Sequence, residues 1–324
     1  MILDTRLANT PRWCIGHSGD MDMRVPDEVR ECVVYLGLPV IAPDGREMMR
    51  PKGTAFFVAV PSQEIEGTTY VYLVTAKHVA RAVQDREFFV RVNDKDGRAV
   101  LIRSGGARWW FHATDESADV AVLAWAPPEF VEHKRIPTGM FLTDETVRSR
   151  SIGTGDEVFI TGLFVHLAGS QRNVPIVRMG NIAMMPDEPV PTEMGMIDAY
   201  LIEARSIGGL SGSPAFVRET VPMGIGAFYL LGLMHGHWDI PPETRDDEMR
   251  TDVEDALGKV NMGIAVVVPA KKILEVLNQP RLVEKRKQED EELRKRRMPT
   301  LDEAMEKQTA NEKGLTKEES EEAL

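Results

Sequence analysis

A succession of short β-branched and aromatic runs constrains the fold more than any other feature of this sequence. Between Cys32 and Pro269 these runs alternate with stretches rich in Gly, Pro, Asp and Asn. Such spacing is typical of an all-β sandwich or barrel. The clearest runs are CVVYLGLPV, TAFFVAV, YVYLVT, EFFVRV, DVAVLAW, DEVFITGLF, AYLIEA, FYLLGLMHG and MGIAVVV. We therefore predict an all-β fold.

The runs fall into two groups, one on each side of the polar stretch TDETVRSRS. This division predicts two β units, at about residues 31–142 and 150–268. A short amphipathic helix is predicted directly after them, at residues 269–278, where a proline precedes AKKILEVL. The apolar residues of that octapeptide recur at helical spacing, with proline at the helix start, where it is tolerated.

The composition changes abruptly after Pro280. From residue 281 to the end, 24 of 44 positions carry a charged side chain. A segment of this composition cannot bury a core of its own, so residues 279–324 are predicted to be a tail, partly helical or disordered. A helix that binds a partner is the alternative interpretation. Residues 1–30 are predicted to be an N-terminal extension.

Charge, hydropathy and cysteine content exclude several classes of function. The net charge of −12 would repel a phosphate backbone, so no nucleic-acid partner is expected. No apolar run approaches the roughly 18 residues of a membrane-spanning helix, and the N-terminus lacks the pattern of a secretory signal. Cys14 and Cys32 suggest neither a disulfide framework nor a zinc site. We expect a cytoplasmic protein without a membrane, metal or cofactor.

Three stretches carry the residue types of nucleophilic catalysis. They are YLVTAKHVA with His78, SADVAVLAW with Asp119 and GGLSGSPAF with Ser211. A serine hydroxyl needs a base in hydrogen-bond contact, and that base needs a third group that fixes its tautomer. Ser211 also lies between Gly209 and Gly212, where the backbone can turn sharply. The N–H groups of Gly209 and Ser211 are therefore candidates for an oxyanion hole.

These stretches resemble the motifs of trypsin-like (chymotrypsin-fold) serine peptidases. TAKHV resembles their T-A-A-H segment, ADVAVLAW their D-I-A-L-L strand and GLSGSP their G-D-S-G-G-P turn, in the same order along the chain. GTAFFV resembles the strand entering their first barrel. GTGDEVFITGLF resembles the opening of the second barrel in bacterial members, and MGIAVVVPAKKILEVL the last strand and closing helix. The resemblance covers roughly residues 50–278.

The resemblance implies two antiparallel six-stranded β-barrels packed across a catalytic cleft, with a C-terminal helix and a charged tail. His78 and Asp119 would lie on the first barrel and Ser211 on the second, within a peptidase domain at residues 31–278. The implied activity is a serine endopeptidase that cleaves protein or peptide substrates through an acyl-enzyme. The peptidase that the resemblance implies is of the bacterial type, without an appended peptide-binding domain.

The sequence departs from the family pattern at three positions. Leu210 replaces the usual acidic residue before the serine, Ser213 the second glycine of the turn, and Lys77 the alanine before the histidine. Without that acidic residue, activation through a freed N-terminus is not expected. A dormant enzyme is still considered, because residues 1–30 or 281–324 could cover the cleft or recruit a regulatory partner.

The resemblance implies that two segments line the substrate pocket, EARSIGG before the serine and GLMHGHW after it. Arg205, His235 and His237 would give this pocket positive or donor character. GLMHGH also resembles the G-x-H-x-G strand of glutamyl endopeptidases and picornavirus-type proteases. The hypothesis is an acidic or Gln-like residue before the cut, with a small apolar pocket as the alternative. For the whole chain, the alternative is a catalytically silent peptidase fold that binds peptides or acts as a scaffold.

Overall fold

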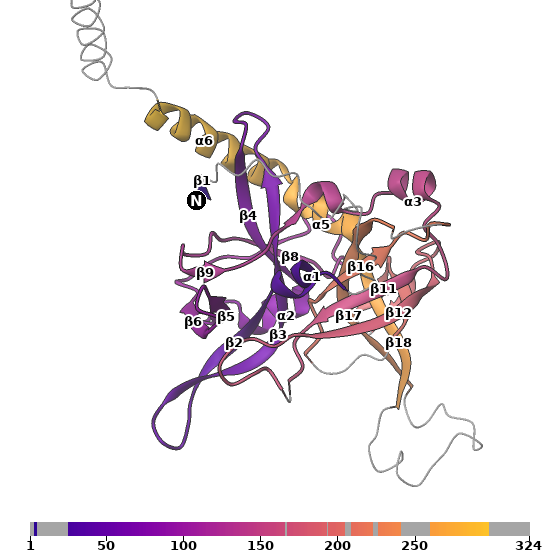
Figure 1. Cartoon of the computed structure of the whole chain (residues 1–324), viewed down its shortest axis with the longest axis horizontal. Coiled ribbons are helices and arrows are strands. Elements are labelled where there is room, and N and C mark those ends of the chain that lie inside the picture. The colour runs from indigo at the N-terminus through magenta and orange to yellow at the C-terminus, as the bar shows by residue number, and fades with distance from the viewer. Residues whose placement is uncertain are drawn as a thin grey trace, which may run out of the picture.

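The computed structural model describes residues 3–4, 25–165, 167–192, 194–204, 209–222, 226–240 and 260–297. Strands dominate these residues, and they form one ten-stranded sheet, one closed barrel and a two-stranded ribbon (Figure 1). The all-β fold class expected from the sequence is confirmed. None of the described helices combines the length and apolar content that crossing a membrane requires.

The first unit is the ten-stranded sheet, and its main path runs β6-β5-β2-β3-β4-β8-β7. The two end strands, β6 and β7, are consecutive in the chain and are separated only by residues 104–109. One interrupted segment therefore supplies both edges of the sheet. The strands are β1 (Leu3–Asp4), β2 (Val33–Ile41), β3 (Glu47–Pro61), β4 (Thr68–Thr75), β5 (Phe89–Asp94), β6 (Ala99–Arg103), β7 (Trp110–Phe111), β8 (Ala121–Ala124), β9 (Val131–Glu132) and β10 (Ile136–Pro137).

The second unit is a closed antiparallel barrel of six strands in the order β11-β12-β15-β18-β17-β16. A polar segment between the units forms a helix, α3, capped by the Thr143 side chain. The strands are β11 (Glu157–Gly162), β12 (Ile176–Met184), β15 (Tyr200–Glu203), β16 (Pro214–Arg218), β17 (Phe228–Ile240) and β18 (Val260–Pro269), and a ribbon of β13 (Val190–Thr192) and β14 (Gly195–Ile197) stands apart from the barrel.

One hydrophobic core joins the two units. Phe56 and Phe57 of β3 are fully buried in the same cluster as Phe159 of β11 and Leu233 of β17. Burial of a large apolar side chain contributes roughly 1.5–3 kcal/mol, so a shared core holds the units together firmly. A smaller second cluster lies in the barrel alone. The described helices are α1 (Asp27–Glu31), α2 (Lys77–Val83), the 3₁₀ turn η2 (Thr138–Met140), α3 (Asp144–Arg150), α5 (Ala270–Leu277) and α6 (Pro280–Arg297).

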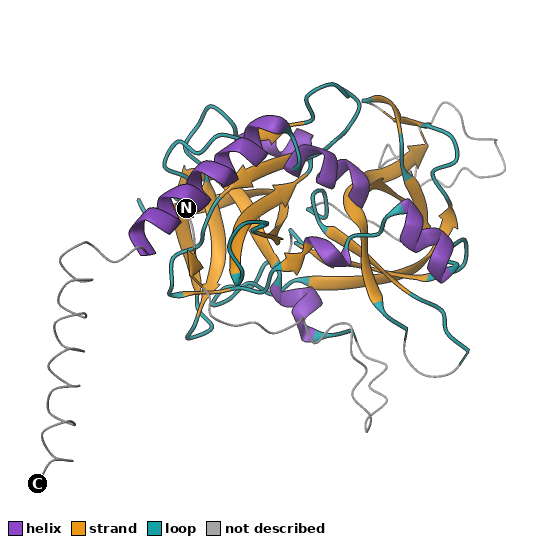
Figure 2. Cartoon of the chain, turned by 90° about the horizontal axis from the view of Figure 1, so that it is seen from above, coloured by secondary structure: helices purple, strands orange, loops and turns teal. Residues whose placement is uncertain are grey.

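The helix expected after the last strand is α5, which buries Ile273 and Val276 in the shared core. The described part of the charged segment that follows is a second helix, α6, which lies along the outside of the first unit (Figures 1 and 2). Leu282 at its start is fully buried, and the Asp290 carboxylate accepts hydrogen bonds from Ser62 Oγ at 2.9 and 3.0 Å. The helix is thus attached to the sheet although its composition is almost entirely charged.

Candidate active site

Strand pairing brings His78 and Asp119 together. β4 and β8 are antiparallel neighbours, and Thr75 at the end of β4 lies opposite Ala121 at the start of β8. His78 follows β4 in the first turn of α2, and Asp119 precedes β8, so both lie at the same end of this strand pair. Asp119 accepts two hydrogen bonds from His78: its Oδ1 from the backbone N–H at 2.9 Å, and its Oδ2 from Nδ1 at 2.8 Å.

A second histidine contacts the same carboxylate. His235 lies in β17 of the barrel, and its Nδ1 is 2.6 Å from Asp119 Oδ2. The two imidazole rings meet edge to face, with their centroids 5.6 Å apart. One buried aspartate from the first unit is therefore held by one histidine of each unit.

The Asp119 carboxylate is ionised in this environment. Its side chain is 0% exposed, and burial by itself would raise its pKa. The hydrogen bonds from His235 and His78, and the charge these rings can carry, outweigh burial and hold the pKa of Asp119 well below its usual range. An ionised carboxylate has no proton to donate, so Nδ1–H must be the donor on both rings. The tautomer of His78 therefore leaves Nε2 able to accept a proton.

Ser211 lies in a turn between the two units. Its backbone oxygen accepts a hydrogen bond from the N–H of Thr54 in β3, and the next residue, Gly212, donates to Met234 O in β17. The Ser211 hydroxyl donates to the backbone oxygen of His235 at 3.2 Å. The structure describes both Ser211 and His78, and no direct hydrogen bond joins them. The hydroxyl of Ser211 therefore contacts the main chain of His235 and not an imidazole ring.

The glycines on both sides of Ser211 have left-handed backbone conformations. Gly209 has φ +99° and Gly212 has φ +82°, which side-chain-bearing residues rarely adopt. Thr54 fixes the first glycine, because its hydroxyl donates to Gly209 O at 2.9 Å. The N–H groups of Gly209 and Ser211 donate no hydrogen bond to any residue that the structure describes. Within the described ranges, no acceptor therefore competes for these two amides.

The remaining candidate residues fall in different places. Arg205 lies outside the described residues. His237 is half-buried in β17, two residues beyond His235. The contact between His235 and Asp119 was not anticipated from the sequence, in which His235 was assigned to the substrate pocket. The roles of Arg205, His235 and His237 as pocket residues stay predictions.

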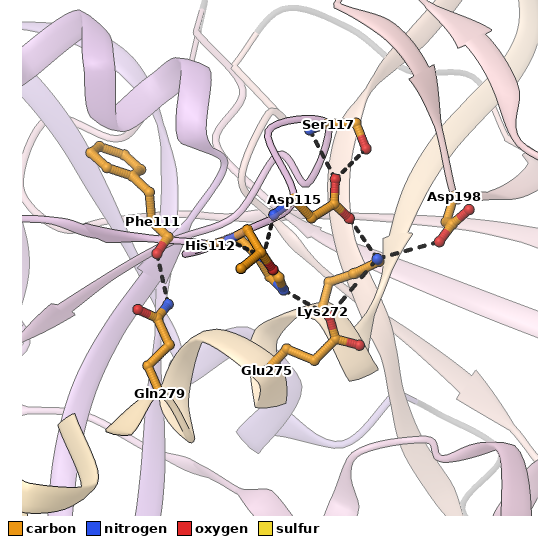
Figure 3. Close-up of polar contacts among 9 residues, drawn as sticks. Phe111, His112, Asp115, Ser117, Asp198, Lys272, Glu275 and Gln279 are labelled. Atoms are coloured by element: carbon orange, nitrogen blue, oxygen red, sulfur yellow. Dashed lines mark hydrogen bonds and ion pairs between the residues drawn. The ribbon is translucent and has the colours of Figure 1, made fainter. Parts of the chain in front are cut away.

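The loop that carries Asp119 is tied to α5 by an ion cluster that the sequence did not reveal. Figure 3 shows the Lys272 ammonium among three carboxylates, with Nζ at 2.6 Å from Asp115, 3.3 Å from Asp198 and 3.8 Å from Glu275. Glu275 in turn contacts His112 Nε2 at 2.8 Å. Asp115 and His112 belong to the segment leading to Asp119, so the closing helix helps to hold that segment in place.

This cluster predicts a pH-dependent loss of stability in Lys272→Met. Burial tends to raise the pKa of Asp115, but hydrogen bonds from Lys272 and Ser117 hold it well below the ordinary range. A carboxyl whose pKa is lower in the folded than in the unfolded chain stabilises the fold above the unfolded value, near 4. That contribution disappears as the pH falls through the lower, folded value.

We expect Lys272→Met to lower the free energy of unfolding by about 1–2 kcal/mol at pH 7. The difference from wild type should shrink steadily below about pH 4, where Asp115 becomes protonated in the variant but not in wild type. Urea denaturation at pH 7, 5 and 3 measures the effect, with the neighbouring Lys271→Met as the matched control. A difference that is independent of pH would contradict the electrostatic explanation.

No family model and no curated protein matches the sequence. Two of the solved structures that resemble the fold illustrate the similarity. One is the HtrA-type protease AlgW with decapeptide, at 20% identity and a TM-score of 0.46, covering 78% of this chain and 64% of that chain. The chain thus spans less than two thirds of AlgW. The other is the MamO protease domain from Magnetospirillum magneticum in the apo form, at 19% identity and a TM-score of 0.47, covering 78% and 98% respectively. The fold assignment therefore rests on the strand order and motifs described above.

Proposed function

We propose that this protein is a serine endopeptidase in which Ser211 is the nucleophile, His78 the general base and Asp119 the group that orients His78. The observation that carries the proposal is the pair of hydrogen bonds from His78 to the buried, ionised Asp119. They fix both the position of the ring and the tautomer with an unprotonated Nε2. An imidazole held in this way beside a serine hydroxyl is the arrangement that activates the hydroxyl.

The proposed reaction begins when the Ser211 proton passes to His78 Nε2 as Oγ bonds to the scissile carbonyl carbon. The amides of Gly209 and Ser211 stabilise the negative oxygen that forms, and each such donor typically contributes about 2.7–4 kcal/mol. His78 then gives its proton to the leaving amine as the C–N bond breaks. Water then bonds to the acyl carbon as its proton passes to His78, and His78 returns that proton to Ser211 Oγ as the acyl–oxygen bond breaks and the carboxylic product leaves.

The resting hydroxyl of Ser211 must turn before it can react. It donates to His235 O, so rotation about the Ser211 Cα–Cβ bond has to bring it to His78 Nε2. Such side-chain rotations take picoseconds to nanoseconds, far faster than a typical turnover. In this proposal, substrate or a regulatory partner favours the rotated state. This dependence on substrate or partner fits a cytoplasmic enzyme that is held dormant until it is activated.

The rival proposal is a catalytically silent fold that binds peptides or acts as a scaffold. It is favoured by the same hydrogen bond to His235 O, because that contact leaves the nucleophile and the base unjoined. The two proposals differ in whether Ser211 can be activated at all, and a covalent probe decides between them.

We expect a fluorophosphonate probe to label the wild-type chain at a single residue, Ser211, identified by peptide mass spectrometry. Ser211→Ala should abolish labelling. The matched control is Ser213→Ala in the same turn, because the Ser213 hydroxyl is buried and has no hydrogen-bond partner among the described residues. That control should be labelled at the wild-type rate. Because the Ser211 hydroxyl samples the rotated state within nanoseconds, even a dormant enzyme should label slowly. A folded wild-type chain that shows no labelling above Ser211→Ala would therefore exclude the peptidase and leave the binding protein.

A further inference from the structure

The second histidine on Asp119 is surplus to a three-residue triad. One imidazole suffices to shuttle the proton, yet His78 and His235 both direct Nδ1 at the same carboxylate oxygen, at 2.8 and 2.6 Å. Their two nitrogens and an Asp119 oxygen all lie within 4.8 Å of one another. The three residues come from separate segments, α2, the loop before β8, and β17. The fold has therefore gathered two imidazole nitrogens and a carboxylate oxygen at one point.

We propose that His78, Asp119 and His235 bind a divalent transition-metal ion of the Zn²⁺ class, and that the bound ion keeps the peptidase inactive. The metal site stands by itself, whereas its inhibitory effect rests on the proposed function. Two imidazoles and one carboxylate are a ligand set that Zn²⁺ uses, with a fourth position left for water.

The geometry needs only a small adjustment to accept the ion. Tetrahedral Zn²⁺ with bonds of about 2.0–2.1 Å separates its ligand atoms by ~3.3 Å, so each nitrogen would move away from Oδ2 by roughly half an ångström. The His78 side chain is 37% exposed and can shift toward solvent, which also gives the ion a route inward. His235 is followed by Gly236, which lies in open space because an added Cβ there would meet nothing within 4 Å. The backbone beside His235 therefore has room for the adjustment.

The charge and the outer contacts of the cluster also suit a cation. Asp119 offers a fully buried carboxylate oxygen, an accepted ligand of Zn²⁺, in contact with both rings at 2.8 and 2.6 Å. The second oxygen of Asp119 is held by the His78 backbone N–H at 2.9 Å. Carboxylates that bind metals are commonly hydrogen-bonded in this way through a further partner, which orients them for the ion.

Metal binding would disable His78 through its tautomer. Coordination at Nδ1 excludes a proton from that nitrogen, so an imidazole that binds the ion there carries its proton on Nε2. With a proton on Nε2, His78 cannot accept the Ser211 proton. Removal of the ion reverses this shift and restores the base. Acid also weakens binding, because protons compete for the imidazole nitrogens.

Direct metal titration tests the site without reference to catalysis. The full chain is freed of metal with a chelator and titrated with Zn²⁺ against a chromophoric competitor, and Co²⁺ absorption reports the coordination geometry. We expect one site in wild type that loses at least about 100-fold in affinity in His235→Ser and in His78→Ala. The matched control is His133→Gln, which removes a histidine whose Nδ1 contacts the Val131 backbone oxygen at 3.1 Å, and it should bind like wild type.

Fluorophosphonate labelling with and without Zn²⁺ tests the inhibitory effect. Zn²⁺ should slow labelling of wild type, EDTA should restore it, and labelling of His235→Ser should be insensitive to the ion. Equal Zn²⁺ affinity in wild type and both site variants, or no binding in wild type, would overturn the site and leave two hydrogen-bonded histidines. Tight binding with unchanged labelling would overturn the inhibition. Failure of metal-free wild type to label refutes the proposed peptidase but leaves the titration result intact.

Discussion

Asp119→Asn is expected to lower kcat/KM for peptide hydrolysis by about 10⁴-fold, the size of effect that this change has in serine-peptidase triads. The structure supplies a specific reason. Asparagine has one oxygen and one NH₂ group where Asp119 has two accepting oxygens. One side of Asp119 faces the His78 backbone N–H and the other faces Nδ1 of His78 and of His235.

The backbone N–H can only donate a hydrogen bond, whereas each imidazole can donate or accept at Nδ1, depending on its tautomer. The asparagine oxygen will therefore face the backbone, and its NH₂ group will face the two rings, which must then accept at Nδ1 and carry their protons on Nε2. His78 in this tautomer cannot take the Ser211 proton. Steady-state kinetics with a fluorogenic peptide measure the loss, and Asp198→Asn, a carboxylate beside Lys272, is the matched control. A variant within tenfold of wild type would refute the role of Asp119.

Gly212→Ala is expected to destabilise the fold by about 3 kcal/mol or more and to abolish activity. Gly212 has φ +82°, and an added Cβ would overlap Thr54 O in β3 and Thr75 Oγ1 in β4. Those two atoms are already hydrogen-bonded to each other at 2.6 Å, so neither can move away without breaking that bond. The turn that carries Ser211 would be pushed away from the first unit.

The matched control for this variant is Gly97→Ala. Gly97 has a similar φ of +77° in the turn between β5 and β6, but an added Cβ there meets nothing within 4 Å. It should cost only the backbone strain, about 1–2 kcal/mol. Chemical denaturation of both variants separates strain from overlap. Equal losses in the two variants would show that the contacts of Gly212 with Thr54 and Thr75 contribute nothing.

The sequence predicted the β architecture well because the strand signal is local. Runs such as TAFFVAV and DEVFITGLF became β3 and β11, since short apolar runs rich in β-branched and aromatic residues favour strands over helices. The convergence of His78 and Asp119 also follows from local order, because each adjoins the end of a strand. Pairing of β4 with β8 then determines their separation.

The contact of His235 with Asp119 could not be predicted, because it depends on a break in strand register. Residues two apart in a regular strand share a face, so His235 and His237 would be expected to point the same way. The pairing of β17 with β18 shifts register between Met234 and Gly236, at His235 itself. A bulge redirects a side chain in a manner that depends on the partner strand, which the local sequence does not contain.

The attachment of α6 was also beyond sequence reasoning. Its composition correctly indicates that it cannot form a core of its own. It is held instead by contacts on the sheet, such as Leu282 in the shared core and a hydrogen bond of 2.8 Å from the Tyr70 hydroxyl to Arg286 O. These partners lie more than 200 residues apart in sequence, so no periodicity of the helix could reveal them.

The core shared by both units has a consequence for biosynthesis. Asp119 emerges from the ribosome more than a hundred residues before His235, and Thr54 well before the Ser211 backbone oxygen that it binds. A nascent chain carries His78 and Asp119 long before Ser211, and the turn of Ser211 lacks its contact with β17 until Met234, which accepts from Gly212, has also been translated. If the proposed function holds, the incomplete chain therefore cannot cleave its neighbours, or itself, while it is still being made.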